Sequence, residues 1–166
     1  NHYFAQQSPP KLIEHIQDRD LWLFKLEGTR EIQANVFSFP YDFDVWDKLM
    51  QTDVRLLVAE GSAIERKHHK DIAELLAVTR REMVIGGHRV PVSNLPYTMA
   101  SDAAGQMAET APFAACYYDR PDARVFSLRS RGDGGLDVAE IAAGYGGGGH
   151  KNASGFQVPL GWEGDK

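Results

Sequence analysis

The chain lacks several features that would assign it to a class at once. Its 166 residues contain a single cysteine, Cys116, which excludes an internal disulfide and a zinc site built from cysteines. No apolar run approaches the ~18 residues of a membrane span, and no secretory signal pattern opens the chain. Basic residues are not in excess, because the net charge is -5. A surface that coats nucleic acid is therefore excluded, whereas a local phosphate site is not. We expect a cytoplasmic protein without a membrane partner.

Other proportions are those of an ordinary folded protein. The apolar fraction is 43% and the charged fraction 25%, and the length suits one domain or one and a half. The chain begins at Asn1, without methionine, and continues in aromatic sequence. We expect a fragment, or a product trimmed at its N-terminus.

The first half of the sequence has helical periodicity. Apolar spacing predicts a short helix from Lys11, another over residues 30–39, and helix almost throughout from Phe43 to about Thr79. Asp18 or Asp20 would cap a second helical turn after the first helix. At residue 81 the period changes to alternation, so we expect a domain boundary near residue 79.

The second half predicts a sheet with helices over it. Gly86-Gly87 between alternating apolar residues indicates a hairpin, and Ser101 would cap a helix that runs to about Glu109. The remaining predicted elements are strands at 113–118 and 124–130, a helix at 138–143, a strand at 155–160 and a loose tail from Gly161. The predicted fold class is α/β, of the α+β kind. A helical connector over 1–79, or the end of an upstream catalytic domain, precedes a mixed β-sheet domain with flanking helices over 80–166.

A run of four glycines near the end of the chain is the most unusual stretch. Packing does not explain such a run at first sight, because glycine has no side chain and loses the most entropy on folding. His150 and Lys151 follow directly, with Asn152 and Ser154 behind. Exposed amides beside cationic and hydroxyl groups suit an anion cradle. A flexible linker is the alternative, but linkers are longer and lack such a cluster.

Arginines on the preceding strand favour the same chemistry. Alternation places Phe126 and Leu128 on one face, and Ser127, Arg129 and (if the strand extends so far) Arg131 on the other. Two arginines on one face suit bidentate recognition of phosphate or carboxylate, although ordinary surface arginines are the alternative. The stretch from residue 120 to residue 151 contains five basic and four acidic residues. This nearly neutral balance suits one terminal phosphate better than a long polyanion.

Adjacent histidines within the predicted long helix do not suggest a metal site. His68 and His69 would point ~100° apart on a helix and so would not share an ion. We read the charged run around them as a solvated face.

The ordered motifs of residues 80–160 resemble the DHH-associated domain of Asp-His-His (DHH) phosphoesterases. The matching stretches are Ser127-Leu128-Arg129-Ser130, residues 137–142, Gly147-Gly148-Gly149-His150-Lys151, Ala153 and Gly155-Phe156, with Asn94 and Ser101-Asp102 upstream. The segment Asp18-Arg19-Asp20-Leu21-Trp22 is similar to the family's connector.

The resemblance implies hydrolysis of phosphodiester bonds in nucleotides or short 5′-phosphorylated oligonucleotides. In the family an upstream domain holds two metal ions, usually manganese, and the associated domain binds the substrate. Carried over, Arg129, Arg131 and Lys151 would hold phosphate, Gly147, Gly148 and Gly149 would allow close backbone approach, and His150 would contact phosphate next to the metals. His150 would stabilise charge there, or act as a general acid.

The departures from the family leave the metal site outside most of this chain. No Asp-His-His run occurs, so an upstream DHH domain would have to hold the ions and this fragment alone would be inactive. Asp18 resembles the family's last metal-ligating aspartate, with a helix cap as the alternative. An RNA-binding module like the C-terminal domain of alanyl-tRNA synthetases, without hydrolysis, is the second hypothesis, and a degenerate interaction domain is the third. Whether the protein forms a homodimer stays open.

Overall fold

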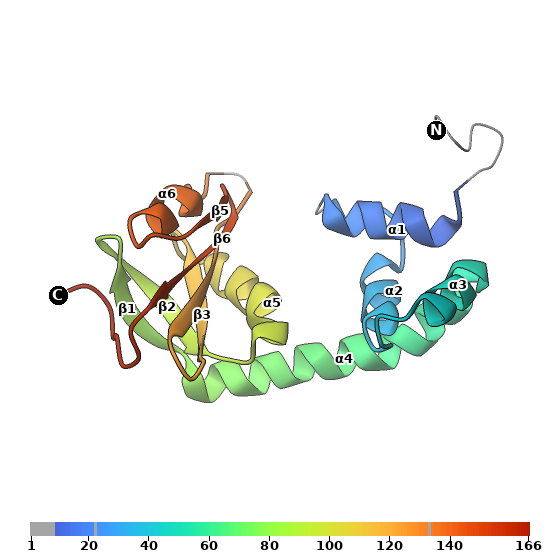
Figure 1. Cartoon of the computed structure of the whole chain (residues 1–166), viewed down its shortest axis with the longest axis horizontal. Coiled ribbons are helices and arrows are strands. Elements are labelled where there is room, and N and C mark those ends of the chain that lie inside the picture. Colours follow the sequence, from blue (N-terminus) through green and yellow to red (C-terminus); the bar gives the residue numbers. More distant parts are fainter. Residues whose placement is uncertain (1–8, 22, 133) are drawn as a thin grey trace. The chain divides into compact units, whose positions relative to one another are not determined.

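The computed structural model describes residues 9–21, 23–132 and 134–166. The chain divides into two compact units, Asn1–Lys70 and Asp71–Lys166, with the division inside one long helix. The elements in order are α1 (Lys11–Asp20), α2 (Thr29–Val36), α3 (Phe43–Gln51), α4 (Val54–Thr79), β1 (Arg81–Ile85), β2 (His88–Asn94), α5 (Tyr97–Ala108), β3 (Ala114–Asp119), β4 (Arg124–Arg129), α6 (Val138–Ala143), β5 (Gly148–His150) and β6 (Ala153–Val158) (Figure 1). Within the described residues, none of these helices has both the length and the apolar character to cross a bilayer.

The first unit is helical, as predicted. Its core consists of Leu12, Ile32, Val36, Leu49 and Leu57, contributed by all four helices. The predicted helix from Phe43 to Thr79 is interrupted at residues 52–53, where α3 ends and α4 begins. Asp42 caps α3 by accepting a hydrogen bond from Val45 N, 3.1 Å. Gly61 brings α2 and α4 together, because a Cβ there would lie 1.8 Å from Glu31 O.

The first helix differs from the prediction at its end. Helix α1 is continuous through Asp20, so neither Asp18 nor Asp20 caps a second helical turn. The apolar residues Leu12 and Ile16 face the core, and this burial carries the helix through the position where a break was predicted.

The second unit contains a six-stranded mixed sheet in the order β1-β2-β3-β4-β6-β5. Only β2 and β3 are parallel among the five pairings, and α5 provides the crossover between them. The β1–β2 hairpin turns at Gly86 and Gly87, with φ of 60° and 77°, as the glycine pair predicted. The structure therefore confirms the α/β class and the order of helices before sheet.

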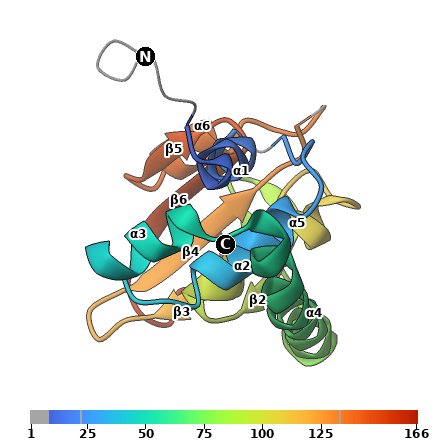
Figure 2. The same cartoon turned by 90° about the vertical axis from the view of Figure 1, so that its right-hand side faces the viewer.

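Helices cover both faces of the sheet. On one face, Ala114 and Cys116 of β3 pack against α5 and the end of α4. On the other face lie α6 and a cluster of aromatic residues around Phe126 and Phe156. Figure 2 shows β5 and β6 side by side with α6 next to them.

Two predicted boundaries in this unit were wrong. Helix α5 begins at Tyr97 after Pro96, one turn before Ser101, because proline is accepted at a helix start. Ser101 therefore lies inside the helix and is not its cap. Part of the glycine run, Gly148–His150, forms strand β5, whereas a loop was predicted.

Candidate functional site

Strand β4 presents its polar residues away from the aromatic cluster. Its side chains alternate between buried and half-buried, with Phe126 and Leu128 in the core and Ser127 and Arg129 on the opposite face. The predicted alternation is thus confirmed. The strand ends at Arg129, so the condition under which alternation would place Arg131 on the same face is not met. Arg131 lies in the following loop, where it is exposed.

The sheet register brings Arg129 and His150 onto one face. Arg129 lies opposite Ala153 of β6, and Ala153 lies opposite His150 of β5. Residues in one row across a sheet share a face, and neighbouring strands are ~4.8 Å apart, so the two backbones lie about 10 Å apart. The methyl group of Ala153 leaves the space between the two side chains open.

The next row of the sheet continues this small-residue surface. Ser127, Gly155 and Gly148 lie opposite one another on β4, β6 and β5, on the same face as Arg129. We call the two rows together the open strip, and its residues are Ser127, Arg129, Gly148, His150, Ala153 and Gly155. All six are exposed or half-buried, so a ligand could reach a floor of small side chains with Arg129 on one side and His150 on the other.

A serine of helix α5 holds the Arg129 side chain in place. Nε and Nη2 of Arg129 donate to Ser101 Oγ at 3.2 and 2.9 Å, and Nη1 donates to the carbonyl oxygen of Leu128 at 2.8 Å. Ordering the guanidinium before a ligand arrives lowers the entropic cost of binding. Sequence reasoning assigned Ser101 to a helix cap, and no local signal connects two residues 28 positions apart.

The single cysteine lies beside Ser127 on the same face of the sheet, under α5, and is not a nucleophile. Burial raises the pKa of the Cys116 thiol to about 12, and the charge of Arg129 only partly opposes this. The thiol therefore stays protonated near neutral pH, where a nucleophile would need the thiolate.

The glycine run serves two different purposes. A Cβ at Gly147 would lie 2.2 Å from Gly155 O, and one at Gly149, where φ is +147°, would lie 2.6 Å from Ser154 Cα. Backbone packing against β6 thus requires glycine at both positions, so the expectation that packing cannot explain the run was wrong. Gly148 differs, because a Cβ there would meet no atom within 4 Å. It lies on an edge strand, where outward backbone groups face solvent.

The turn between β5 and β6 is clamped to the loop after β4. Lys151 and Asn152 form the two-residue turn between paired His150 and Ala153. Asn152 Nδ2 donates to Ser130 Oγ at 3.0 Å and to Arg131 O at 2.6 Å. This holds Lys151, which is exposed, and Arg131 in the same neighbourhood as His150. Their role as phosphate ligands stays a prediction.

Asp18 organises the segment between α1 and α2. Its Oδ1 accepts from Lys25 N at 2.9 Å, and its Oδ2 accepts from Leu26 N at 3.1 Å and Thr29 Oγ1 at 2.8 Å. Because Thr29 donates its proton to Asp18, Nδ1 of His15 donates to Thr29 Oγ1, 2.9 Å away. Burial raises the pKa of the Asp18 carboxyl, but these hydrogen bonds outweigh it, and the pKa lies below its usual value.

The described residues do not form a metal site by themselves. Across 9–21, 23–132 and 134–166, no three or more His, Cys, Asp or Glu side chains gather closely enough to hold an ion. Both Asp18 oxygens already accept hydrogen bonds, so the site does not fit a metal without further ligands. Trp22, quoted in the connector resemblance, lies outside the described residues. His69 pairs with Glu65 one turn away, 2.8 Å, as a helix-surface pair.

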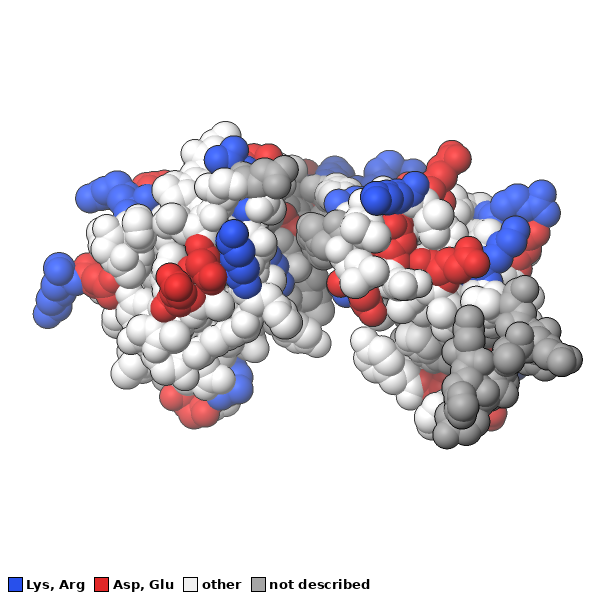
Figure 3. Space-filling model, turned by 90° about the horizontal axis from the view of Figure 1, so that it is seen from above, with Lys and Arg blue, Asp and Glu red and all other residues white. Residues whose placement is uncertain are grey.

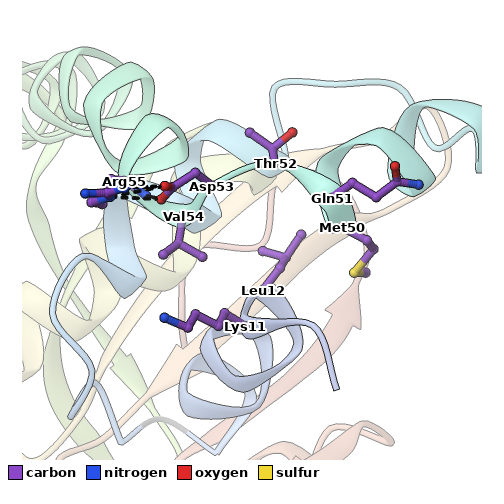
Figure 4. A pocket seen from close by; sticks show the side chains of 8 residues that line it. All are labelled: Lys11, Leu12, Met50, Gln51, Thr52, Asp53, Val54 and Arg55. Atoms are coloured by element: carbon purple, nitrogen blue, oxygen red, sulfur yellow. Dashed lines mark hydrogen bonds and ion pairs between the residues drawn. The ribbon is translucent and has the colours of Figure 1, made fainter. Parts of the chain in front are cut away.

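A separate hollow of about 480 Å³ lies in the first unit (Figure 4). Leu12, Met50 and Val54 give it an apolar floor, and Asp53 and Arg55 at its rim bond each other. The hydrogen bond from Arg55 is the main cause that lowers the pKa of Asp53 to about 2. Asp53 and Arg55 satisfy each other, Lys11 also lines the hollow, and none of the predicted phosphate ligands does.

Comparison with known proteins shows which fold the chain has. No known family profile matches the chain. PggH, a pGpG-specific phosphodiesterase from Vibrio cholerae, superposes with a TM-score of 0.51 over 96% of this chain and 66% of its own, at 13% identity. The DHH domain of a member of a ribosomal protein family superposes with a TM-score of 0.50 over 86% of this chain and 40% of its own, at 16% identity. The chain has the DHH-protein fold.

The DHH fold confirms the predicted resemblance at the level of architecture. Uncharacterized protein R106 of Acanthamoeba polyphaga mimivirus is 29% identical over 164 residues, which are 93% of this chain and 38% of that protein. The chain thus spans well under half of this relative.

Proposed function

We propose that this chain is the substrate-binding part of a phosphoesterase and binds the phosphate of a nucleotide or short oligonucleotide on the open strip. The observation that carries the proposal is the row Arg129–Ala153–His150, in which an arginine and a histidine flank a small residue on one face of the sheet. The anchoring of Arg129 by Ser101 supports it, as does the fold shared with a phosphodiesterase.

The side chains would divide the work of holding an anion. Arg129 would offer N–H groups to two phosphate oxygens, since its planar fork suits bidentate contacts. His150 would donate a further hydrogen bond from the opposite side, and Gly148 would let the phosphate approach the backbone closely. All three interactions strengthen as charge builds up on the phosphoryl oxygens.

Hydrolysis would require groups beyond the described residues. In the whole protein we propose divalent ions, with manganese the expected metal, held by an upstream domain. Such ions activate water and stabilise the leaving oxygen. The isolated chain should therefore bind without hydrolysing. Manganese-dependent hydrolysis by these 166 residues would contradict this part of the proposal.

The proposal is tested by titrating the chain calorimetrically with a 5′-phosphorylated dinucleotide. Replacing Arg129 by alanine should weaken binding at least about 10-fold, because a hydrogen bond to a charged group contributes ~1.5–3 kcal/mol. The matched control is Arg89→Ala, an exposed arginine on strand β2 of the same sheet, which should bind as the wild type does. Equal affinities for all three proteins would refute the site.

Salt dependence separates this function from a general RNA-binding module. Charges of both signs are interspersed over each unit on the face shown in Figure 3. A site for one or two phosphates should give a slope of log affinity against log salt no steeper than about -2 between about 50 and 200 mM. A steeper slope with long structured RNA would favour the RNA-binding module.

A further inference from the structure

An exposed aromatic pair lies at the start of helix α5. The Tyr97 side chain is 70% exposed, and its ring centroid is 5.9 Å from that of Tyr118, with the planes tilted by 50°. Tyr118 lies opposite Val125 in the β3–β4 register, and Val125, Ser127 and Arg129 share one face of β4. The pair therefore belongs to the same face of the sheet as the open strip.

Helix geometry places Tyr97 one turn of α5 from Ser101, the residue that holds the Arg129 guanidinium. Tyr97 and Ser101 are four residues apart in α5, so they lie on the same side of the helix, about 6 Å apart along its axis. Ser101 Oγ is the atom that holds the guanidinium. Gly105 comes next on this side, and a Cβ there would meet no atom within 4 Å. This side of α5 is therefore accessible beside the cation.

A tyrosine at a helix start can simply be a surface residue, and single exposed aromatics are common. The second observation that distinguishes Tyr97 is its position one helical turn from Ser101, which anchors Arg129. An aromatic face next to a phosphate-binding cation matches the two ends of a nucleotide, since bases stack on aromatic rings whatever their identity.

We propose that Tyr97, supported by Tyr118, stacks on the nucleobase of a nucleotide whose phosphate binds at Arg129. This inference rests on the proposed function and deepens it, because it assigns the side chain that would bind the base of the nucleotide. It also implies modest discrimination among bases, since stacking reads the π-face and not the hydrogen-bonding edge.

The test compares two ligands that differ only in the base, 5′-AMP and ribose 5-phosphate, by calorimetric titration of the 166-residue chain. Wild type should bind 5′-AMP more tightly than ribose 5-phosphate. Tyr97→Ala should weaken 5′-AMP binding about 10-fold, within the range measured for base–aromatic stacking, and change ribose 5-phosphate binding less than about 2-fold. Tyr97→Phe keeps the ring and should retain the affinity for 5′-AMP. Tyr41→Ala, at a tyrosine of the first unit that is 84% exposed, is the matched control and should have no effect.

The outcomes separate this inference from the proposed function. If Arg129→Ala weakens both ligands but Tyr97→Ala weakens neither, the phosphate site stands and the stacking site is refuted. An equal loss of both ligands in Tyr97→Ala, or equal affinities of wild type for the two, also refutes stacking. If wild type binds neither ligand, both proposals fail.

Discussion

The two faces of strands β4, β6 and β5 carry opposite kinds of side chain. On one face Phe126 and Phe156 stack with centroids 4.9 Å apart, Tyr145 stacks on Phe156 at 4.4 Å, and Trp162 meets all three rings edge-on. We call these four residues the aromatic face. The open strip on the other side has glycine, alanine and serine between Arg129 and His150.

The difference shows how one short stretch of sheet serves both stability and binding. Aromatic side chains bury ~150–250 Å² each, so the aromatic face can hold β4 and β6 against the segments that follow α6 and β6. The opposite face is then free to carry small residues that contribute little to the core. Stability and binding should therefore respond separately to substitutions at neighbouring positions of the same strand.

Substitutions at adjacent residues of β4 test most directly whether stability depends on one face of the strand and not on the other. Phe126→Ala removes a ring that is 1% exposed and should lower the free energy of unfolding by about 3–5 kcal/mol. Ser127→Ala, one residue further on, should change it by less than about 0.5 kcal/mol. Urea denaturation followed by circular dichroism measures both.

Similar losses for the two variants would contradict the division into a stabilising and a binding face. A large loss in Ser127→Ala alone would mean that the open strip is covered by something that stabilises the fold.

A second comparison uses adjacent glycines of the run. Gly147→Ala places a methyl group against the carbonyl of Gly155 and the Cβ of Phe156, at 2.2 and 2.7 Å, and should cost about 1–3 kcal/mol through displacement of β5. Gly148→Ala places it in open space and should leave the unfolding free energy unchanged within about 0.5 kcal/mol. The same denaturation experiment measures both.

For ligand binding, the informative variant of this pair is Gly148→Ala. Gly148→Ala should weaken dinucleotide binding in a stable protein, because the methyl group lies on the open strip. If Gly148→Ala binds as the wild type does, the run serves packing alone, and the close approach of phosphate at this position is refuted.

Much of the architecture could be predicted because its signals are local. The Gly86-Gly87 hairpin, the alternation along β4 and the helix at 138–143 each depend on a few neighbouring residues. Predicted boundaries were wrong where tertiary contacts determine the end of an element. Helix α1 is an example, because its burial against α2 and α3 extends it through Asp20.

The candidate site could be predicted only in part, because it depends on pairing between distant segments. The sequence placed Arg129 and the glycine run near a common anion, but the row Arg129–Ala153–His150 follows from strand register. The Ser101 anchor and the position of Tyr97 depend on how α5 packs on β4. Periodicity carries no information on either contact.

The tail after β6 was predicted to be loose, and it is instead bound to the sheet. Glu163 pairs with Arg81 and with Arg124, whose Nη1 lies 2.8 Å from Glu163 Oε1. Tyr145 Oη donates to Asp165 Oδ2 at 2.6 Å and accepts from Gly86 N at 2.6 Å. Contacts between residues far apart in the sequence explain why the composition of the tail alone was misleading.

The smallest expected loss of stability comes from removing the Tyr145 hydroxyl, which bonds Asp165 of the tail. Tyr145→Phe keeps the ring stacking but loses both hydrogen bonds of the hydroxyl, so it should cost about 0.5–1.5 kcal/mol at neutral pH. Burial, with a contribution from Asp165, raises the pKa of Tyr145 to about 12. The unfolded chain has an ordinary tyrosine pKa of ~10, so the stabilisation by Tyr145 is complete below about pH 10 and is lost as the pH rises toward 12.

The pH dependence of this small effect is what tests it. The difference in unfolding free energy between wild type and Tyr145→Phe should be constant below about pH 10 and should shrink between about pH 10 and 12. Parallel curves for wild type and Tyr145→Phe would mean that the hydroxyl contributes nothing that depends on its proton, and that the aromatic face is held by ring packing alone.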